Sequence, residues 1–162
     1  MAESCRSYRW QGRLLEVGAG AGGFVRVARA RGWRVDATEI SKSGVEALLG
    51  TGATVFAGDV LAANYPDKLF DMVVSFEVLE HLSAPLRYLR EFWRVTRPGG
   101  LLLLTTPNFN GLSRRYLGVR WRVIAPEHLG YFTPATLSHA LREAGYLGVT
   151  GRGDSLLAWA YQ

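Results

Sequence analysis

The residues with the clearest chemical potential lie in a glycine-rich stretch near the start of the chain. Residues 14–23 read LLEVGAGAGG, an apolar run that ends in an acid, Glu16, and is followed by a glycine turn and a helical pattern from Phe24 onward. Glycine lets the backbone turn sharply and approach a ligand closely. A helix that begins at such a turn directs its free N–H groups at an anionic group. The order of strand, glycine loop and helix therefore predicts a site for a nucleotide-like cofactor.

The glycines alone leave two kinds of cofactor open. Gly18-x-Gly20-x-x-Gly23 also fits the dinucleotide fingerprint, in which a pyrophosphate rests on the helix end. Glu39 ends the next apolar run, about 20 residues further on, where a carboxylate accepts hydrogen bonds from two ribose hydroxyls. That position suits both cofactors. Asp59 ends a third apolar run, so three acids follow three consecutive strand candidates.

Apolar runs and helical patterns alternate along the rest of the chain. Residues 101–104 form an unbroken apolar run, which is typical of a strand covered on both faces. This alternation predicts a parallel sheet with helices on both sides, and the tail predicts two short antiparallel strands around a turn at 151–154. Ser41 and Thr133 stand where helix N-caps belong. The expected strands are 13–17, 33–38, 53–57, 70–75 and 100–105, and the expected helices are 22–31, 41–50, 84–96 and 133–144.

Taken in order, these features resemble a class I S-adenosylmethionine-dependent methyltransferase of the ubiquinone-biosynthesis-like branch. The resemblance covers roughly residues 13–146 and rests on the order and spacing of several motifs. It implies an α/β fold: a single Rossmann-like domain with a doubly wound sheet, mostly parallel, with an antiparallel C-terminal strand. The motifs are Glu16-x-Gly18-x-Gly20-x-Gly22, Gly58-Asp59-Val60, Glu77-Val-Leu-Glu-His81-Leu, Arg97-Pro-Gly-Gly100 and the segment 126–137, PEHLGYFTPATL.

The resemblance implies S-adenosylmethionine as the cofactor and S-adenosylhomocysteine as its product. Glu16 would orient the loop and the amino end of the methionine moiety, Glu39 would bind the ribose diol, and Asp59 would approach the adenine amino group. Phe24 or Phe76 would place a π face near the sulfonium, with core packing as the alternative for both. The implied cofactor contacts are Glu16, Gly18, Ala19, Gly20, Gly22, Glu39, Ile40, Asp59, Val60, Phe76, Glu77 and Val78.

Two histidines are the candidates for proton transfer. Methyl transfer depends mainly on alignment of nucleophile, methyl carbon and sulfur, but a hydroxyl acceptor needs a base. His128 is the expected base, because it ends an irregular segment and imidazole accepts a proton near neutral pH. His81 either caps the turn after the fourth strand or reaches the same site. The histidine spacing predicts no metal site, and Glu77 and Glu80 are not expected to be ligands.

Residues 106–132 form a long connection with no clear period, and loops of that length in compact domains are often functional. We expect this segment to be a substrate-side insert whose aromatic residues cover the acceptor. Guanidinium groups suit phosphate and carboxylate, so its arginines predict an anionic or sugar-like small molecule, unless they only keep the loop solvated. The acceptor atom stays open between oxygen, nitrogen and carbon. The arginines are Arg114, Arg115, Arg120 and Arg122.

Composition limits the class of protein. The chain has 162 residues, 48% hydrophobic and 20% charged, which fits one globular domain from 1 to 162. It has no apolar run near the ~20 residues that a membrane span needs. Its single cysteine, Cys5, fits a reducing compartment, so we expect a cytoplasmic protein. We expect it to be a monomer or a homodimer. The net charge of +5 comes mostly from arginines at helical spacing, which indicates solvated faces and no nucleic-acid partner.

Rival functions remain open at this level. Only residues 1–12 precede the first strand, and we expect them to be a disordered or truncated N-terminal lid. Because such a lid would leave the cofactor site open, a catalytically silent cofactor-binding domain is an alternative to an active enzyme. A nicotinamide oxidoreductase is less favoured, because the chain has no Tyr-x-x-x-Lys pair and little room for a substrate domain. A nucleic-acid methyltransferase is disfavoured too, since residues 75–78 read SFEV where a base-methylating motif would stand.

Overall fold

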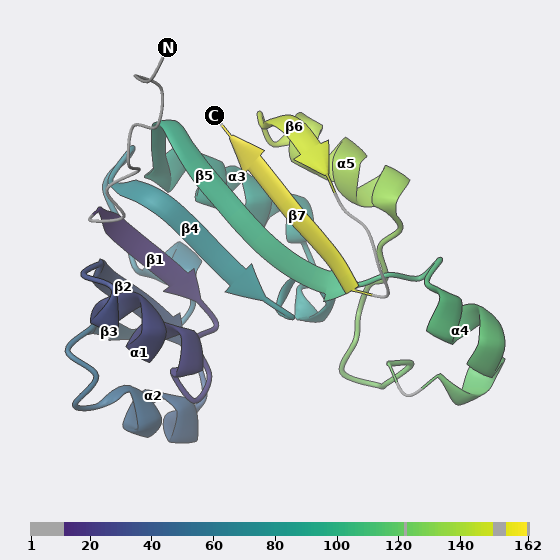
Figure 1. Ribbon diagram of the computed structural model, residues 1–162, viewed down its shortest axis with the longest axis horizontal. Helices are drawn as coiled ribbons and strands as arrows, with labels where there is room; N and C mark the ends of the chain where they lie inside the picture. The colour runs from purple at the N-terminus through teal and green to yellow at the C-terminus, as the bar shows by residue number, and fades with distance from the viewer. Residues whose placement is uncertain (1–11, 122, 151–154, 162) are drawn as a thin grey trace, which may run out of the picture.

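One seven-stranded sheet organises the computed structural model, which describes residues 12–121, 123–150 and 155–161 (Figure 1). The strand order is β3-β2-β1-β4-β5-β7-β6; β1 to β5 run parallel, and β7 is antiparallel to both β5 and β6. The predicted doubly wound sheet with an antiparallel C-terminal strand is confirmed. The strands are β1 Arg13–Val17, β2 Arg34–Glu39, β3 Thr54–Ala57, β4 Phe70–Phe76, β5 Thr96–Pro107, β6 Leu147–Thr150 and β7 Ser155–Tyr161.

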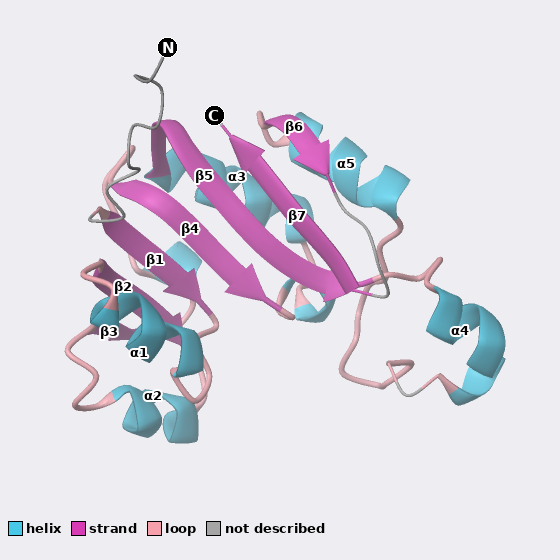
Figure 2. Cartoon of the chain, in the orientation of Figure 1, coloured by secondary structure: helices cyan, strands magenta, loops and turns pink. Residues whose placement is uncertain are grey.

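Helices cover the sheet on both faces (Figure 2). On one face α3 (Pro85–Val95) and α5 (Pro134–Glu143) bury Phe92 and Leu141 against β4, β5 and β7. On the other face α1 (Gly23–Ala30) and α2 (Lys42–Leu48) bury a smaller core around β1 and β2. Because the order of strands reverses between β1 and β4, the carboxyl ends of these two strands form the crevice where open α/β sheets bind ligands.

The predicted helices are confirmed, with ends within two residues of those expected. The Ser41 hydroxyl accepts a hydrogen bond from the Gly44 N–H at 3.1 Å, as an N-cap should. Thr133 and Thr136 form a reciprocal capping box, and Pro134 occupies the first helical position. Local polar residues thus set where these helices begin.

Two segments differ from the sequence-based expectation. β5 begins at Thr96, directly after α3, because Thr96 pairs with Phe70 across an irregular register that then joins Met72 to Leu101. Residues 106–132 contain a short helix, α4 (Leu112–Leu117), followed by a 3₁₀ turn, Gly118–Arg120. A helix of six residues is too short to show a hydrophobic period. The predicted turn at 151–154 lies outside the described residues.

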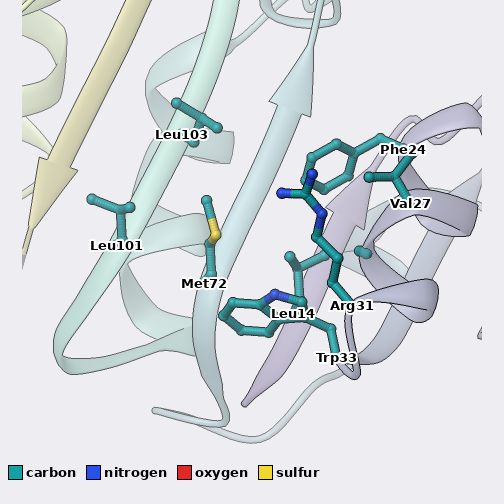
Figure 3. A pocket seen from close by; sticks show the side chains of 9 residues that line it. Leu14, Phe24, Val27, Arg31, Trp33, Met72, Leu101 and Leu103 are labelled. Carbon is teal, nitrogen blue, oxygen red and sulfur yellow. The ribbon is translucent and has the colours of Figure 1, made fainter. Parts of the chain in front are cut away.

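An apolar groove of about 800 Å³ runs along the α1 face of the sheet (Figure 3). Figure 3 shows side chains of α1 on one side of it and side chains of β4 and β5 on the other. It lies on the face of the sheet and not at the carboxyl ends of the strands, so it is not where an α/β fold places its cofactor. No helix among the described residues is long and apolar enough to cross a membrane. The groove is lined by Leu14, Phe24, Val27, Ala28, Arg31, Trp33, Met72, Leu101 and Leu103.

Candidate functional site

The glycine loop joins β1 to α1 and folds over the end of β2. The N–H groups of Gly18 and Ala19 both donate to the Thr38 carbonyl, at 2.9 and 3.1 Å. Gly18 has a φ of 71°, and a Cβ there would lie 2.5 Å from Val78 Cγ2, so only glycine fits. Gly20 also has a positive φ, 51°, but within the described part of the chain no atom apart from those of its two sequence neighbours lies within 4 Å of its ideal Cβ position. The loop is therefore tight on the Val78 side and leaves open space beside Gly20.

Glu16 is a buried acid at the end of β1, only 4% exposed. Burial raises the pKa of its carboxyl to about 7, although the Val25 N–H in the first turn of α1 favours the charged form. Its Oε2 is buried and has no hydrogen-bond partner among the residues described. A buried acceptor without a donor is energetically costly, so this oxygen is suited to receive a donor from a ligand.

Glu39 ends β2 and accepts hydrogen bonds from two loops, the glycine loop and the loop before α2. Its Oε2 accepts the Gly20 N–H and its Oε1 accepts the Ser41 N–H, both at 2.8 Å. Burial opposes the charged form, but the hydrogen bonds from Ser41 and Gly20 outweigh it and lower the pKa of Glu39. An ionised carboxylate has about four acceptor positions, so both oxygens keep capacity for ligand hydroxyls.

Asp59 follows β3 and lines the same cleft. Its Oδ1 accepts the Leu61 N–H at 2.8 Å, and its Oδ2 accepts the Tyr88 hydroxyl at 2.5 Å. Burial, with this hydrogen bond to Asp59, raises the pKa of Tyr88 to about 12. Ile40 lines the opening and is 79% exposed. The cleft is lined by Val17, Gly18, Thr38, Glu39, Ile40, Gly58, Asp59, Val60, Val78, Leu82 and Tyr88.

The structure sorts the predicted cofactor contacts into four groups. Phe76 packs edge to face against Phe24, with ring centroids 5.1 Å apart, in line with the core-packing alternative. Glu77 is exposed and has a φ of 54°, which is strained for a residue other than glycine. Gly18, Glu39, Ile40, Asp59, Val60 and Val78 line the cleft, whereas Glu16, Ala19, Gly20 and Gly22 belong to β1 and the adjoining loop.

Five further residues line the cleft without being among the implied cofactor contacts. Gly58 and Leu82 belong to motifs quoted above, whereas Val17, Thr38 and Tyr88 were not singled out. Tyr88 lies on α3, far from the glycine loop in sequence, and its neighbours form an ordinary amphipathic helix. Its contact with Asp59 depends on how α3 packs, so no local sequence signal identifies it. Thr38 precedes Glu39 and takes part through its backbone carbonyl, a role that any residue can fill.

A second polar cluster lies at the carboxyl ends of β4 and β5. The rings of His81 and His128 meet edge to face with centroids 4.7 Å apart. His81 Nδ1 is 3.0 Å from the Glu127 carbonyl, so His81 contacts the distant loop that carries His128. Next to it, Glu80 accepts a hydrogen bond from Thr106 Oγ1 at 2.9 Å, and burial raises the pKa of Glu80. The fold thus joins the two predicted catalytic histidines and adds a buried acid.

Aromatic side chains give the 106–132 segment its own small core. The Phe109 and Tyr131 rings are tilted by 42° with centroids 5.4 Å apart, and the ring of Trp121, a residue only 5% exposed, has its centroid within 6.5 Å of both. The Arg114 guanidinium sits over the Phe109 ring at 3.9 Å. The predicted arginine cluster is therefore divided: Arg114 is half-buried on this core, Arg115 and Arg120 are exposed, and Arg122 lies outside the described residues.

Comparisons with known proteins agree with this geometry. A sequence model of the family described as "Methyltransferase domain" matches residues 9–150. The malonyl-[acyl-carrier protein] O-methyltransferase of Serratia marcescens is 33% identical over 127 residues, which cover 76% of this chain and 49% of that protein. The chain thus spans about half the length of this curated relative.

Solved structures share the fold. A possible histamine N-methyltransferase from Thermotoga maritima superposes with a TM-score of 0.78 at 19% identity, over 93% of this chain and 82% of that one. The [4+2]-cyclase SpnF superposes with a TM-score of 0.68 at 30% identity, over 86% of this chain and 53% of that one. The likeness therefore extends to a protein whose name describes a different reaction.

Proposed function

The chain belongs to the methyltransferase domain family, and we propose that it transfers the methyl group of S-adenosylmethionine to a small-molecule acceptor. The observation that carries this proposal is the cleft at the carboxyl ends of β1, β2 and β3. Glu16, Glu39 and Asp59 stand at or just beyond the ends of these three neighbouring strands. This is the edge of the sheet where α/β folds bind nucleotides.

The residues present fit this cofactor, which would supply a methyl carbon already activated by a sulfonium. The buried, unpartnered Oε2 of Glu16 is an acceptor for the ammonium of the methionine moiety. The open space beside Gly20 lets the cofactor approach the backbone. Glu39 would accept both ribose hydroxyls while its existing hydrogen bonds hold the carboxylate in position.

The adenine ring would lie between apolar side chains at the far end of the cleft. Ile40 and Val60 both line it, and the exposed Ile40 side chain would become buried on binding. Asp59 would accept a hydrogen bond from the adenine amino group. The Tyr88 hydroxyl donates to Oδ2 and so holds the carboxylate in place for this contact. We propose Val78, beside Gly18, as the boundary between the cofactor and the acceptor.

We place the acceptor over the ends of β4 and β5, beneath the 106–132 segment. His128 and His81 meet at this edge, and His128 would take the proton of a hydroxyl acceptor. The half-buried Arg114 supports an acceptor with an anionic group, because guanidinium geometry matches carboxylate and phosphate. Thr105 and Thr106 lie near the carboxyl end of β5, where the strand leads into the 106–132 segment.

A domain that binds the cofactor without transferring methyl is the second candidate. The likeness to the [4+2]-cyclase SpnF favours it, because one fold supports several reactions and does not by itself decide among them. The two candidates share the cofactor cleft. They differ in whether S-adenosylhomocysteine is produced when an acceptor is supplied.

Product formation separates the two candidates. The chain would be incubated with S-adenosylmethionine and acceptor panels of phenols, carboxylic acids, amines and sugars, and S-adenosylhomocysteine would be measured by mass spectrometry. We expect turnover with one acceptor class, and a loss of at least ~100-fold in His128→Ala with unchanged cofactor affinity. Tight cofactor binding without product in any panel would favour the silent domain, and no cofactor binding would reject both.

We further propose that the domain works in a reducing compartment, as a monomer or homodimer. A chain with a single cysteine forms no internal disulfide, which suits such a compartment. Size-exclusion chromatography with light scattering would distinguish the two oligomeric states, and a larger assembly would contradict both.

A further inference from the structure

Glu80, His81 and His128 form a compact cluster of metal-ligating groups. Each offers one ligand atom, and these atoms all lie within 4.8 Å of one another. Glu80 and His81 belong to the 3₁₀ turn Leu79–His81 after β4, whereas His128 comes from the loop beyond α4. The spacing of these residues in the sequence gives no sign of a metal site, because the fold alone brings the two segments together.

Hydrogen bonds fix the cluster from both segments. The Glu80 carbonyl accepts the N–H groups of Leu129 at 2.8 Å and Gly130 at 3.1 Å, which holds the His128 loop against the turn. His81 Nδ1 is 3.0 Å from the Glu127 carbonyl. If Nδ1 carries the proton of this bond, the Nε2 lone pair is left for a ligand, which is the outer-shell arrangement typical of metal-bound histidines.

The cluster pairs a buried acid with an imidazole nitrogen that has no partner among the described residues. Glu80 is 1% exposed, and its carboxylate accepts hydrogen bonds from Thr106 Oγ1 at 2.9 Å and from its own backbone N–H. His128 Nδ1 is buried and finds no hydrogen-bond partner in the ranges the structure describes. Buried polar groups are normally satisfied, so a buried acid beside an unpartnered imidazole nitrogen suits a cation as a ligand.

We propose that Glu80, His81 and His128 bind one divalent transition-metal ion, with Zn²⁺ as the reference ion. Imidazole ligands suit zinc, iron, cobalt and nickel, whereas magnesium and calcium prefer all-oxygen sites. Bonds of about 2.0–2.2 Å require ligand atoms roughly 3.3 Å apart in a tetrahedral site, so small side-chain rotations close the cluster around the ion. Two histidines and one carboxylate leave further coordination positions open.

An ion held by this cluster would lie at the carboxyl ends of β4 and β5, where we place the acceptor, and this step rests on the proposed function. A coordinated hydroxyl loses its proton to solvent more readily than a free one. The oxygen then forms a bond to the methyl carbon, the carbon–sulfur bond breaks, and its electron pair stays on sulfur. A bound ion would take over the role proposed above for His128 as the base, because His128 would then be its ligand, and the site would favour oxygen as the acceptor atom.

Metal binding is tested on the full chain without cofactor or acceptor, so its outcome does not depend on methyl transfer. Tag-free protein carrying Cys5→Ser, which removes the only thiol, would be titrated with Zn²⁺ by calorimetry against a competing chelator. We expect one ion per chain, and at least a 100-fold loss of affinity in His128→Ala and His81→Ala. Thr106→Val, which removes the hydroxyl that orients Glu80, should lose about 10- to 100-fold.

His139→Ala is the matched control, because His139 is an exposed histidine on α5 whose side chain contacts Glu143. It should bind Zn²⁺ as the parent does. Circular dichroism melting checks that each variant folds, and His81, being exposed, is the safest of the three positions to replace. Absence of stoichiometric Zn²⁺ binding to the parent, or equal affinity in His128→Ala and His139→Ala, would overturn the proposal.

Discussion

Replacing Glu16 by glutamine should stabilise the unliganded protein at alkaline pH. Burial raises the pKa of Glu16 from 4.5 to about 7. An acid whose pKa is higher in the folded state than in the unfolded state lowers the free energy of unfolding. This loss is absent below the unfolded-state pKa, grows between the two pKa values and is complete above the folded-state pKa. At 1.36 kcal/mol per pKa unit, this difference corresponds to at most ~3 kcal/mol. Glu16→Gln keeps the shape of the side chain and removes the charge.

Urea unfolding at pH 5 and pH 8 measures this effect. The stability gained by Glu16→Gln should be ~2 kcal/mol larger at pH 8 than at pH 5, because between pH 5 and about 7 the unfolded wild-type carboxyl is ionised while the folded one still holds its proton. Glu46→Gln, at an exposed carboxylate on α2, should change stability by less than ~0.5 kcal/mol at either pH. An equal effect of Glu16→Gln at both pH values would refute the reasoning.

The same carboxyl should make cofactor binding depend on pH. If Glu16 must be ionised to receive the cofactor ammonium, binding releases a proton below the pKa of about 7. Affinity for S-adenosylmethionine should then fall by about tenfold per pH unit as the pH drops below 7. Calorimetry in two buffers of different ionisation enthalpy at pH 6 measures the proton released. A pH-independent affinity would show that Glu16 does not contact the ammonium.

Three further substitutions test other parts of the cleft. Glu39→Gln should weaken cofactor binding at least tenfold by calorimetry, and it should lower the melting temperature too, because Gly20 and Ser41 lose a charged acceptor; unchanged affinity would mean that Glu39 only braces the loops. Gly18→Ala should destabilise the fold by ~1–3 kcal/mol in urea unfolding, since it combines a positive φ with a clash at Val78; a neutral effect would contradict the loop geometry. Tyr88→Phe should cost ~1 kcal/mol in urea unfolding through its lost hydrogen bond, and wild-type stability would mean that this bond contributes nothing.

Much of the fold could be predicted from the sequence because its signals are local. Apolar runs mark the strands, Ser41 and Thr133 mark helix starts, and the glycines mark the loop that needs positive φ. The early start of β5 could not be predicted, because Thr96 joins the sheet through pairing with Phe70. Such pairing depends on neighbouring strands and leaves no trace in the local pattern.

The candidate site divides in the same way. Glu39 was expected to bind ribose from its place at a strand end, but its hydrogen bonds to two loops depend on how those loops fold over it. Tyr88 and the contact between His81 and His128 arise where distant segments pack together. Sequence spacing therefore predicted the strand-end acids and missed the groups that tertiary structure adds beside them.

Calorimetric titration of the unliganded chain with S-adenosylmethionine and with NAD tests the central claim most directly. The strand-end acids predict one molecule of S-adenosylmethionine per chain at pH 8, with a Kd at least tenfold lower than that for NAD, and an at least tenfold weaker Kd in Glu39→Gln. Binding of NAD with no measurable binding of S-adenosylmethionine would contradict the account.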